Sequence, residues 1–242
     1  MPDASASRPR PGTRGISEAL REWVEEIPLE RGSILDFVEQ IAASAPPGER
    51  VLDLGAGDAP YRELFEHTAY RTSDWERSLH AGARSADIVA PAWALPLEDE
   101  SVGLILCTQM LEHVPEPARV LDECFRLLTP GGRLALTVPL AWEPHELPHD
   151  YYRYTEPGIR HLLTSSGFVD IETAPRTDGF TTLAQLMLNL SYGLEPATDG
   201  LDAERDEARG MLRDLSARLV RLAPLDVGRG LTLGYTATAR RP

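Results

Sequence analysis

Apolar positions alternate between two spacings from about residue 50 to residue 175. Short apolar runs, typical of buried strands, are separated by segments in which apolar residues recur every three to four positions, as in helices. We predict strands at residues 51–54, 69–73, 86–90, 103–107, 133–138 and 168–173. Strands that alternate with helices indicate an α/β fold with a mostly parallel sheet and helices on both faces.

The residues before the first strand divide into two parts. Residues 1–15 are rich in Pro, Ser, Gly and Arg, and we predict that they are disordered because they have nothing apolar to bury. Residues 16–47 carry two helical patterns, opened by Ser17 and by Ser33, two residues of a type that caps helices. We expect these helices to cover the sheet edge or the mouth of the site, as part of one domain that spans residues 16–242.

The pattern changes between residues 179 and 228, where we predict a helical insertion. Leucine-rich stripes occur at residues 183–190 and 211–222, and the second helix is charged on its other face. Such stripes favour core packing or a dimer interface over a substrate tunnel. We expect the insertion to cover the active face or to pair with another subunit in a homodimer. A last strand of alternating type follows at residues 231–239.

The centre of the predicted fold is the stretch 51–61, Val-Leu-Asp-Leu-Gly-Ala-Gly-Asp-Ala-Pro-Tyr. A buried strand that contains Asp53 breaks into a turn at Gly55 and Gly57, where the missing side chains let the backbone approach a ligand. Pro60 suits the first turn of a helix. Strand, turn and helix N-terminus together predict a ligand site at the carboxyl end of the sheet. The alternative is a tight turn without a ligand.

Composition limits the partners of the chain. It has 24 basic and 38 acidic residues, and the net charge of −14 disfavours binding to nucleic acid or to an anionic membrane. Every basic residue is Arg, which excludes a Schiff-base or P-loop lysine. Two cysteines, Cys107 and Cys124, are too few for a disulfide framework or a thiolate zinc site. Since the sequence also lacks a long apolar run and an apolar signal core, we expect a cytoplasmic protein.

Four further features accompany the later strands. Asp74 ends the second strand, where a carboxylate can accept hydrogen bonds from both hydroxyls of a ribose. The other three are Ala-Trp-Ala-Leu-Pro-Leu at 92–97, Cys-Thr-Gln-Met-Leu-Glu-His-Val at 107–114 and Leu-Thr-Pro-Gly-Gly at 128–132. This succession resembles the class I S-adenosylmethionine-dependent methyltransferases, specifically the small-molecule branch with LEHV and LxPGG motifs.

The resemblance implies a Rossmann-like sheet of seven strands, the last one antiparallel, and S-adenosyl-L-methionine as the cofactor. The residues that it assigns to the cofactor are Asp53, Gly55, Gly57, Asp74, Trp75, Ala92, Trp93, Gln109 and His113. The first three would hold the methionine moiety, with the carboxylate near its ammonium group. Asp74 would bind the ribose, and Trp75, Ala92 and Trp93 would contact the adenine. Gln109 and His113 would lie near the sulfonium. An alternative role for His113 is to orient a neighbouring loop through a hydrogen bond.

Two positions depart from the family pattern. Ala59 replaces the third glycine of the usual turn, a change that a small residue should tolerate. Pro91 stands where many relatives have an acid that reads the adenine amino group. We therefore expect the affinity for the cofactor to be weakened but not lost.

The catalytic candidates lie in residues 142–154, a loop after the fifth strand that is crowded with His, Tyr and acidic residues. His145 and His149 titrate near neutrality and could deprotonate a hydroxyl, oriented by Glu146 or Asp150. The two histidines and Asp150 also have the spacing of a divalent-metal site. The third interpretation is a structural lid. We predict catalytic roles for His145, His149 and Asp150 and assign no metal ion.

The sequence thus predicts methyl transfer to a small molecule, with the oxygen of a secondary metabolite or sugar-bearing intermediate as the preferred acceptor. Two alternatives stay open. The chain could keep the cofactor but catalyse a non-methylating step, as a cyclase or isomerase, or it could be a non-catalytic subunit.

Overall fold

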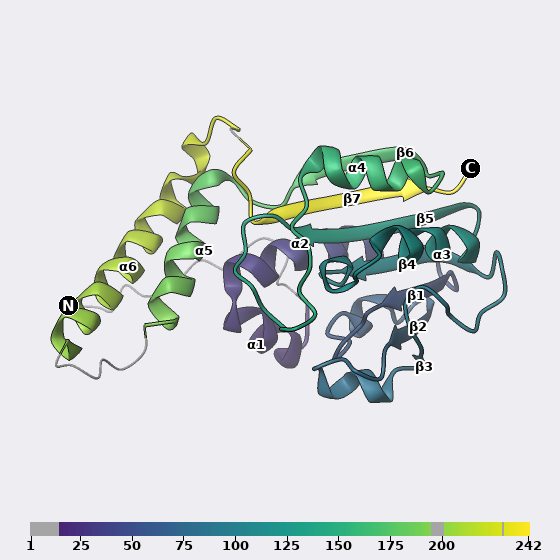
Figure 1. The fold of residues 1–242 in the computed structure, drawn as a ribbon, viewed down its shortest axis with the longest axis horizontal. Coiled ribbons are helices and arrows are strands. Elements are labelled where there is room, and N and C mark those ends of the chain that lie inside the picture. The colour runs from purple at the N-terminus through teal and green to yellow at the C-terminus, as the bar shows by residue number, and fades with distance from the viewer. Residues whose placement is uncertain (1–14, 195–200, 229) are drawn as a thin grey trace.

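Seven strands form one sheet in the order β3-β2-β1-β4-β5-β7-β6 in the computed structural model, which describes residues 15–194, 201–228 and 230–242 (Figure 1). The strands are β1 (Arg50–Leu54), β2 (Ala69–Asp74), β3 (Ile88–Val89), β4 (Val102–Thr108), β5 (Leu128–Pro139), β6 (Val169–Pro175) and β7 (Gly234–Arg240). Neighbours from β3 to β5 pair in parallel, and β7 runs antiparallel between β5 and β6. The predicted Rossmann-like sheet with an antiparallel last strand is confirmed, whereas the disorder predicted for residues 1–15 falls on a segment that lies outside the described residues except for Gly15.

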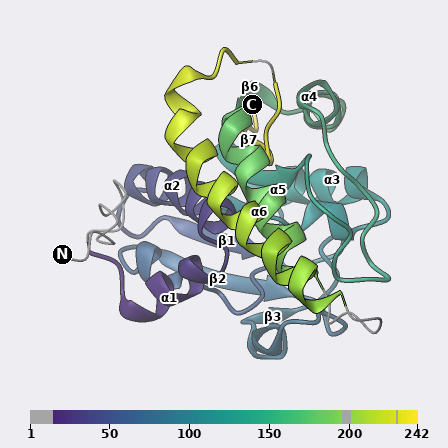
Figure 2. The ribbon, with the colours of Figure 1, turned by 90° about the vertical axis from the view of Figure 1, so that its left-hand side faces the viewer.

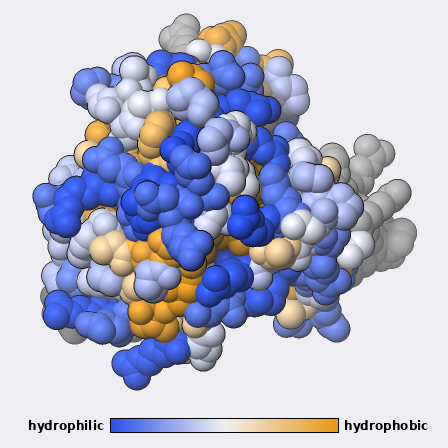
Figure 3. All heavy atoms as spheres, turned by 90° about the vertical axis from the view of Figure 1, so that its right-hand side faces the viewer, coloured by the Kyte–Doolittle hydropathy of each residue, from blue (hydrophilic) through white to orange (hydrophobic). Residues whose placement is uncertain are grey.

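Helices cover both faces of the sheet. They are α1 (Glu18–Glu26), α2 (Pro28–Ser44), α3 (Pro117–Leu127), α4 (Glu156–Ser165), α5 (Gly179–Tyr192) and α6 (Asp202–Leu222), with short 3-10 helices η1 (Arg62–Phe65), η2 (Ala81–Ser85), η3 (Leu111–His113) and η4 (Ala223–Leu225). In the described ranges, none of the helices combines the length and the apolar composition that crossing a bilayer requires. The side of the molecule away from α5 and α6 is mostly hydrophilic (Figure 3).

The core consists of two apolar layers separated by the sheet. On β4, Leu104 and Leu106 pack in the layer of α1 and α2, whereas Ile105 and Cys107 pack in the layer of α3 and α4. Successive side chains point to opposite faces of a strand. A central strand that is buried on both faces therefore appears in the sequence as an unbroken apolar run.

Two local predictions are wrong. Ser17 does cap α1, since its hydroxyl accepts a hydrogen bond from the amide of Leu20, but Ser33 lies inside α2 and its hydroxyl donates to the carbonyl of Glu30. The helix begins earlier because Pro28, suited to a first turn, starts it.

After the glycine turn only the 3-10 helix η1 forms, because Phe65 is already buried in the core and the chain enters β2 at residue 69. No α-helix N-terminus therefore follows the turn.

A buried ion pair joins α2 to the end of β6. The side chain of Arg176, the residue after β6, is completely buried, and its guanidinium donates to Glu30 Oε1 at 2.8 Å and to Ser33 Oγ at 3.1 Å. Gly234 of β7 makes room for it, because a Cβ there would lie 2.7 Å from Arg176 Nη2. This pair fastens the N-terminal helices beneath the antiparallel edge of the sheet.

Removal of one member of this pair should be strongly destabilising, because it leaves an uncompensated buried charge. We expect Arg176→Met to lower the free energy of unfolding by about 3–5 kcal/mol, measured by urea denaturation. The double variant Glu30→Leu/Arg176→Met removes both charges and should recover part of the loss. A double variant that is as unstable as Arg176→Met would contradict this interpretation.

Candidate functional site

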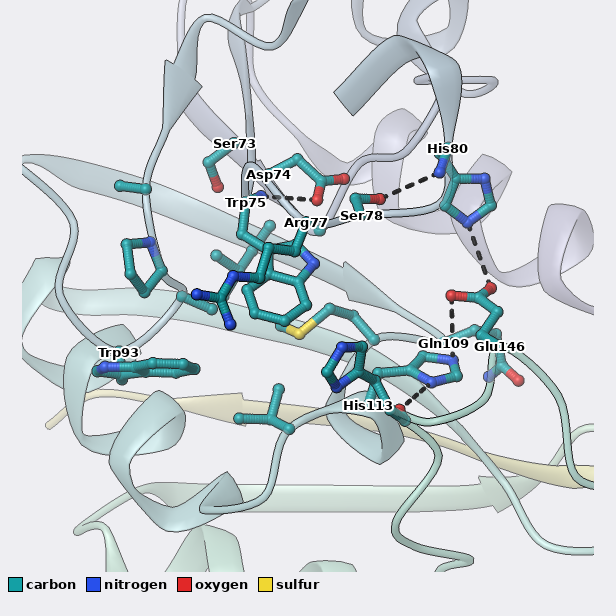
Figure 4. Close-up of a pocket in the computed structure, with 18 of the residues that line it drawn as sticks. Ser73, Asp74, Trp75, Arg77, Ser78, His80, Trp93, Gln109, His113 and Glu146 are labelled. Carbon is teal, nitrogen blue, oxygen red and sulfur yellow. Dashed lines mark hydrogen bonds and ion pairs between the residues drawn. The ribbon is translucent and has the colours of Figure 1, made fainter. Parts of the chain in front are cut away.

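A cavity of about 270 Å³ opens at the carboxyl ends of the parallel strands (Figure 4). Its walls come from the turn after β1, the segments after β2, β3 and β4, and the 142–154 loop. They comprise Leu54, Gly55, Ser73, Asp74, Trp75, Arg77, Ser78, His80, Ala90, Pro91, Ala92, Trp93, Gln109, Met110, His113, Val114, Pro115, Glu146, His149 and Tyr151. A ligand is expected at this edge in an open parallel sheet.

Asp74 is held in the cavity wall by the glycine turn. Its Oδ2 accepts a hydrogen bond from the amide of Gly57 at 2.8 Å, and its Oδ1 accepts one from the amide of Trp75 at 2.7 Å. The turn itself needs glycine, since Gly55 has φ +73° and a Cβ there would lie 2.2 Å from Met110 Cγ. Ala59 keeps the geometry of a third glycine, with φ +51°. The ends of β1 and β2 are thus locked together around one carboxylate.

Aromatic side chains form two walls of the cavity. Trp75 follows Asp74 directly, and Trp93 lies in the segment after β3 (Figure 4). That segment is fastened from α3: Glu123 accepts a hydrogen bond from the amide of Leu95 at 2.7 Å, and Arg126 donates to the carbonyl of Leu95 at 3.2 Å. The indole rings are therefore presented by anchored backbone.

Asp53 stands apart from the other predicted cofactor residues, and it does not line the cavity. Its side chain lies on the α1 and α2 side of the sheet and is buried, with Oδ2 accepting a short hydrogen bond from the Tyr70 hydroxyl. Burial raises the pKa of Asp53 to about 7. Its Oδ1 has no hydrogen-bond partner among the described residues. Of the other eight predicted cofactor residues, seven line this cavity, and Gly57 lines a second cavity beside it.

A second cavity, of about 200 Å³, adjoins the first. The two share Gly55, His80, Gln109 and Glu146, which form the boundary between them. The remaining walls come from the turn, the N-terminal helical segment, the end of β4 and the loop. They comprise Ala56, Gly57, Asp58, Pro60, Tyr61, Trp23, Ile27, Glu30, Arg31, Ile34, Thr108, Trp142 and His145. The segment of helices α1 and α2 thus supplies part of the wall of the second cavity.

Asp150 mainly anchors the 142–154 loop. Its carboxylate accepts two hydrogen bonds from Arg153, at 2.6 and 2.8 Å, and one from the amide of His145 at 2.9 Å. The Arg153 guanidinium lowers the pKa of Asp150 to about 2. Both carboxylate oxygens are therefore occupied in fixing the loop.

The two candidate histidines lie in different cavities. His149 lines the first cavity with its ring 5.1 Å from that of Trp75, and its carbonyl accepts a hydrogen bond from His113 Nδ1 at 2.8 Å. His145 lines the second cavity. The metal site suggested by the spacing of His145, His149 and Asp150 is therefore not assembled in the described part of the chain, and His113 does orient the loop as its alternative role predicts.

A different cluster, which the sequence analysis missed, joins η3 to the loop. Glu112, His113 and His145 each offer a ligand atom within 4.8 Å of the others. The Glu112 carboxyl is fully buried, neither oxygen has a hydrogen-bond partner in the described ranges, and burial raises its pKa to about 8. Burial also lowers the pKa of His113, whose Nε2 lies 3.9 Å from Glu112 Oε1. The signal for this cluster in the sequence is the Glu-His pair of the LEHV motif, Glu112 and His113.

Glu146 bridges the boundary of the two cavities. Its Oε1 lies 3.3 Å from His80 Nε2, and its Oε2 lies 3.9 Å from His113 Nε2 (Figure 4). The interaction with Glu146 raises the pKa of His80, and the same contact lowers the pKa of Glu146. The loop is thus latched across the site by a pair of opposite charges.

The comparisons with known proteins agree with this architecture. Residues 52–136 match the family model described as a methyltransferase domain. The chain is 31% identical over 139 residues to a ubiquinone biosynthesis O-methyltransferase of Psychrobacter cryohalolentis, a match that covers 50% of this chain and 52% of that protein. It is 31% identical over 170 residues to a malonyl-acyl carrier protein O-methyltransferase of Methylococcus capsulatus, covering 60% of this chain and 62% of that protein.

The chain therefore spans about half to three fifths of the length of these curated relatives. Among solved structures, the (4+2)-cyclase SpnF superposes with a TM-score of 0.54 at 21% identity, covering 86% of this chain and 81% of that one. This likeness concerns the fold, which a protein named for cyclisation also has. Over residues 52–136 the chain is therefore similar to a methyltransferase domain, and its seven-stranded sheet has the topology that the resemblance predicted.

Proposed function

We propose that this protein binds S-adenosyl-L-methionine in the first cavity and transfers its methyl group to a hydroxyl of a small molecule held in the second. The observation that carries the proposal is the Asp74 carboxylate, fixed by the amide of Gly57 in a cavity with indole walls. A carboxylate suits the two hydroxyls of a ribose, and Trp75 and Trp93 suit a flat base. The cofactor supplies an activated methyl group, and the protein supplies alignment and a base.

The methyltransferase domain match over residues 52–136 supports the assignment of the cofactor. Of the two departures from the family pattern, Ala59 preserves the turn. Pro91 lies in the wall of the first cavity, where its side chain offers no hydrogen bond to an adenine amino group. Affinity below that of relatives with an acid at this position is the expected consequence.

His145 is the base that we propose for a hydroxyl acceptor. Its Nδ1 lies 3.2 Å from the carbonyl of Glu143 and 3.5 Å from Asp150 Oδ2, and a single donor, Arg153 Nη2, lies 3.4 Å away. Two acceptors against one donor favour a proton on Nδ1, which leaves the lone pair of Nε2 free to take a proton. The relatives named as O-methyltransferases support oxygen as the acceptor atom.

The walls of the second cavity indicate an acceptor with an apolar or aromatic body. Trp23, Ile27, Ile34 and Trp142 supply apolar surface for such a body, and charged side chains that include Glu30, Arg31 and Asp58 line the same cavity and suit polar substituents. Such a pocket suits a hydroxylated intermediate of a biosynthetic pathway, including a secondary metabolite or a sugar attached to an apolar aglycone.

Asp74→Asn should weaken binding of S-adenosylhomocysteine by more than about tenfold, because the amide cannot accept hydrogen bonds on both sides. Isothermal calorimetry measures the dissociation constant. Glu76→Gln is the matched control: it removes an exposed acid two residues away that lines neither cavity. Equal affinities of the two variants would remove Asp74 from the site.

His145→Gln should lower kcat by about 10²- to 10⁴-fold, with little change in cofactor affinity, and should remove the acid limb of the pH–rate profile. The assay measures S-adenosylhomocysteine formed with a hydroxylated acceptor found by screening. His149→Gln, in the first cavity, should instead weaken cofactor binding. Cofactor binding without turnover on any acceptor would favour the non-methylating alternative, and an unchanged kcat in His145→Gln would exclude this base.

The latch between His80 and Glu146 should make loop closure depend on pH. The ordinary pKa is 4.5 for Glu146, which is lowered here, and 6.5 for His80, which is raised. The stabilisation of the closed loop is therefore complete between about pH 4.5 and pH 6.5, and it is lost as the pH rises further, through the pKa of folded His80.

Hydrogen exchange of residues 143–149, corrected for the intrinsic effect of pH, should therefore show lower protection at pH 9 than at pH 6. The variant His80→Asn should be equally unprotected at both values. A wild-type loop whose corrected protection does not change with pH would contradict the latch.

A further inference from the structure

Helices α5 and α6 form an arm, residues 179–222 without the undescribed 195–200, that stands away from the sheet (Figure 1). The two helices pack against each other, α6 lies on the outer side, and no other element covers it in the view onto the arm (Figure 2). No described residue of the arm lines either cavity of the site. The described part of the arm thus contributes no wall to the site, and its outer surface lacks a function within the molecule.

Helix α6 buries little of itself in its own molecule. Ser216 is its only buried residue over 21 positions. Met211, Leu215 and Leu222 have exposed fractions of 65%, 44% and 40%. An isolated helix of this length gains most of its stability from packing an apolar face. Exposed apolar residues on such a helix indicate that another surface covers them.

The exposed residues of α6 form one continuous stripe. Residues separated by three or four positions lie on the same helix face. The stripe consists of Glu204, Glu207, Met211, Leu215, Arg218 and Leu222, all of them exposed. It has an acidic end, an apolar centre and an end that carries Arg. A surface that covers this stripe must therefore offer basic, apolar and acidic groups in matching order.

Charge is divided along the helix. The first half, residues 202–212, contains four acids and two Arg, whereas the second half, residues 213–222, contains three Arg and one acid. Glu204, Glu207 and Arg218 form no ion pair with any described residue of their own chain. The helix dipole favours acids in the first turn and bases in the last, but it does not account for Glu207 or Arg218, which lie further in.

We propose that α6 pairs with α6 of a second copy of this chain, antiparallel about a two-fold axis. A two-fold interface requires a surface that is complementary to itself. In the antiparallel arrangement Met211 of each copy packs beside Leu215 of the other, and the acidic half of each helix faces the Arg-bearing half of its partner. A parallel arrangement would place acids against acids. The two arms thereby form a four-helix interface outside both active sites.

The test is the oligomeric state of the full chain, measured by sedimentation equilibrium at a salt concentration of about 0.1 M. The wild type should be a dimer. Variant A, Glu204→Arg/Glu207→Arg, and variant B, Arg218→Glu/Arg221→Glu, each place like charges against each other, so each should dimerise at least about tenfold more weakly. An equimolar mixture of A and B restores complementarity and should form a heterodimer with affinity near that of the wild type.

The mixture distinguishes the arrangement from a folding defect, because misfolded variants would not recover when mixed. The apolar control Met211→Asp/Leu215→Asp should remain monomeric alone and in every mixture. A wild type that stays monomeric at about 100 μM, whether or not it binds vesicles or another protein, would overturn the proposal. A mixture of A and B that stays monomeric would overturn it equally.

Discussion

The site depends on one hydrogen bond, from the amide of Gly57 to the carboxylate of Asp74. It joins the exit of β1 to the end of β2, and it can form only because the turn between them adopts backbone angles that suit glycine. Gly55 lets the segment after β4 approach, since Met110 occupies the space that a Cβ would fill. Three strand ends therefore converge on one point, and the cavity is what remains between them. A change at the turn would alter the carboxylate and the cavity together.

The 142–154 loop shows how far crowded titratable residues can mislead. Asp150 is saturated by Arg153 and a backbone amide, His149 contributes its carbonyl to His113, and the Tyr154 hydroxyl donates to the carbonyl of Leu111. These contacts order the loop over the site. His145 alone combines a place in the second cavity with a ring nitrogen free of an assigned bond. Most polar groups of this loop therefore serve to order it, and the catalytic role that we propose is confined to His145.

Sequence reasoning succeeded where the relevant information is local. Central strands buried on both faces appear as apolar runs, and the antiparallel β7 appears as an alternating one. It failed where the outcome depends on packing between distant segments. The helix expected after Pro60 is missing because Phe65 reaches the core first. Asp53 lines neither cavity, because side-chain parity turns it toward the α1 and α2 face of β1, and its role toward a cofactor stays a prediction. The burial of Glu112 beside His145 could not be predicted, because it arises only when η3 packs against the 142–154 loop.

The charge pattern of the arm bears on how two copies of an acidic chain can associate. Two copies that each carry a net charge of −14 repel one another, so association needs local complementarity. The division of charge along α6 provides it at short range, where two helices are in contact. Salt acts differently on the two effects: the Debye length of about 10 Å at 0.1 M screens the repulsion between distant charges more than the attraction between touching ones. A segregated helix on an acidic protein therefore favours self-pairing at moderate ionic strength, and it does so without placing any constraint on the residues of the site.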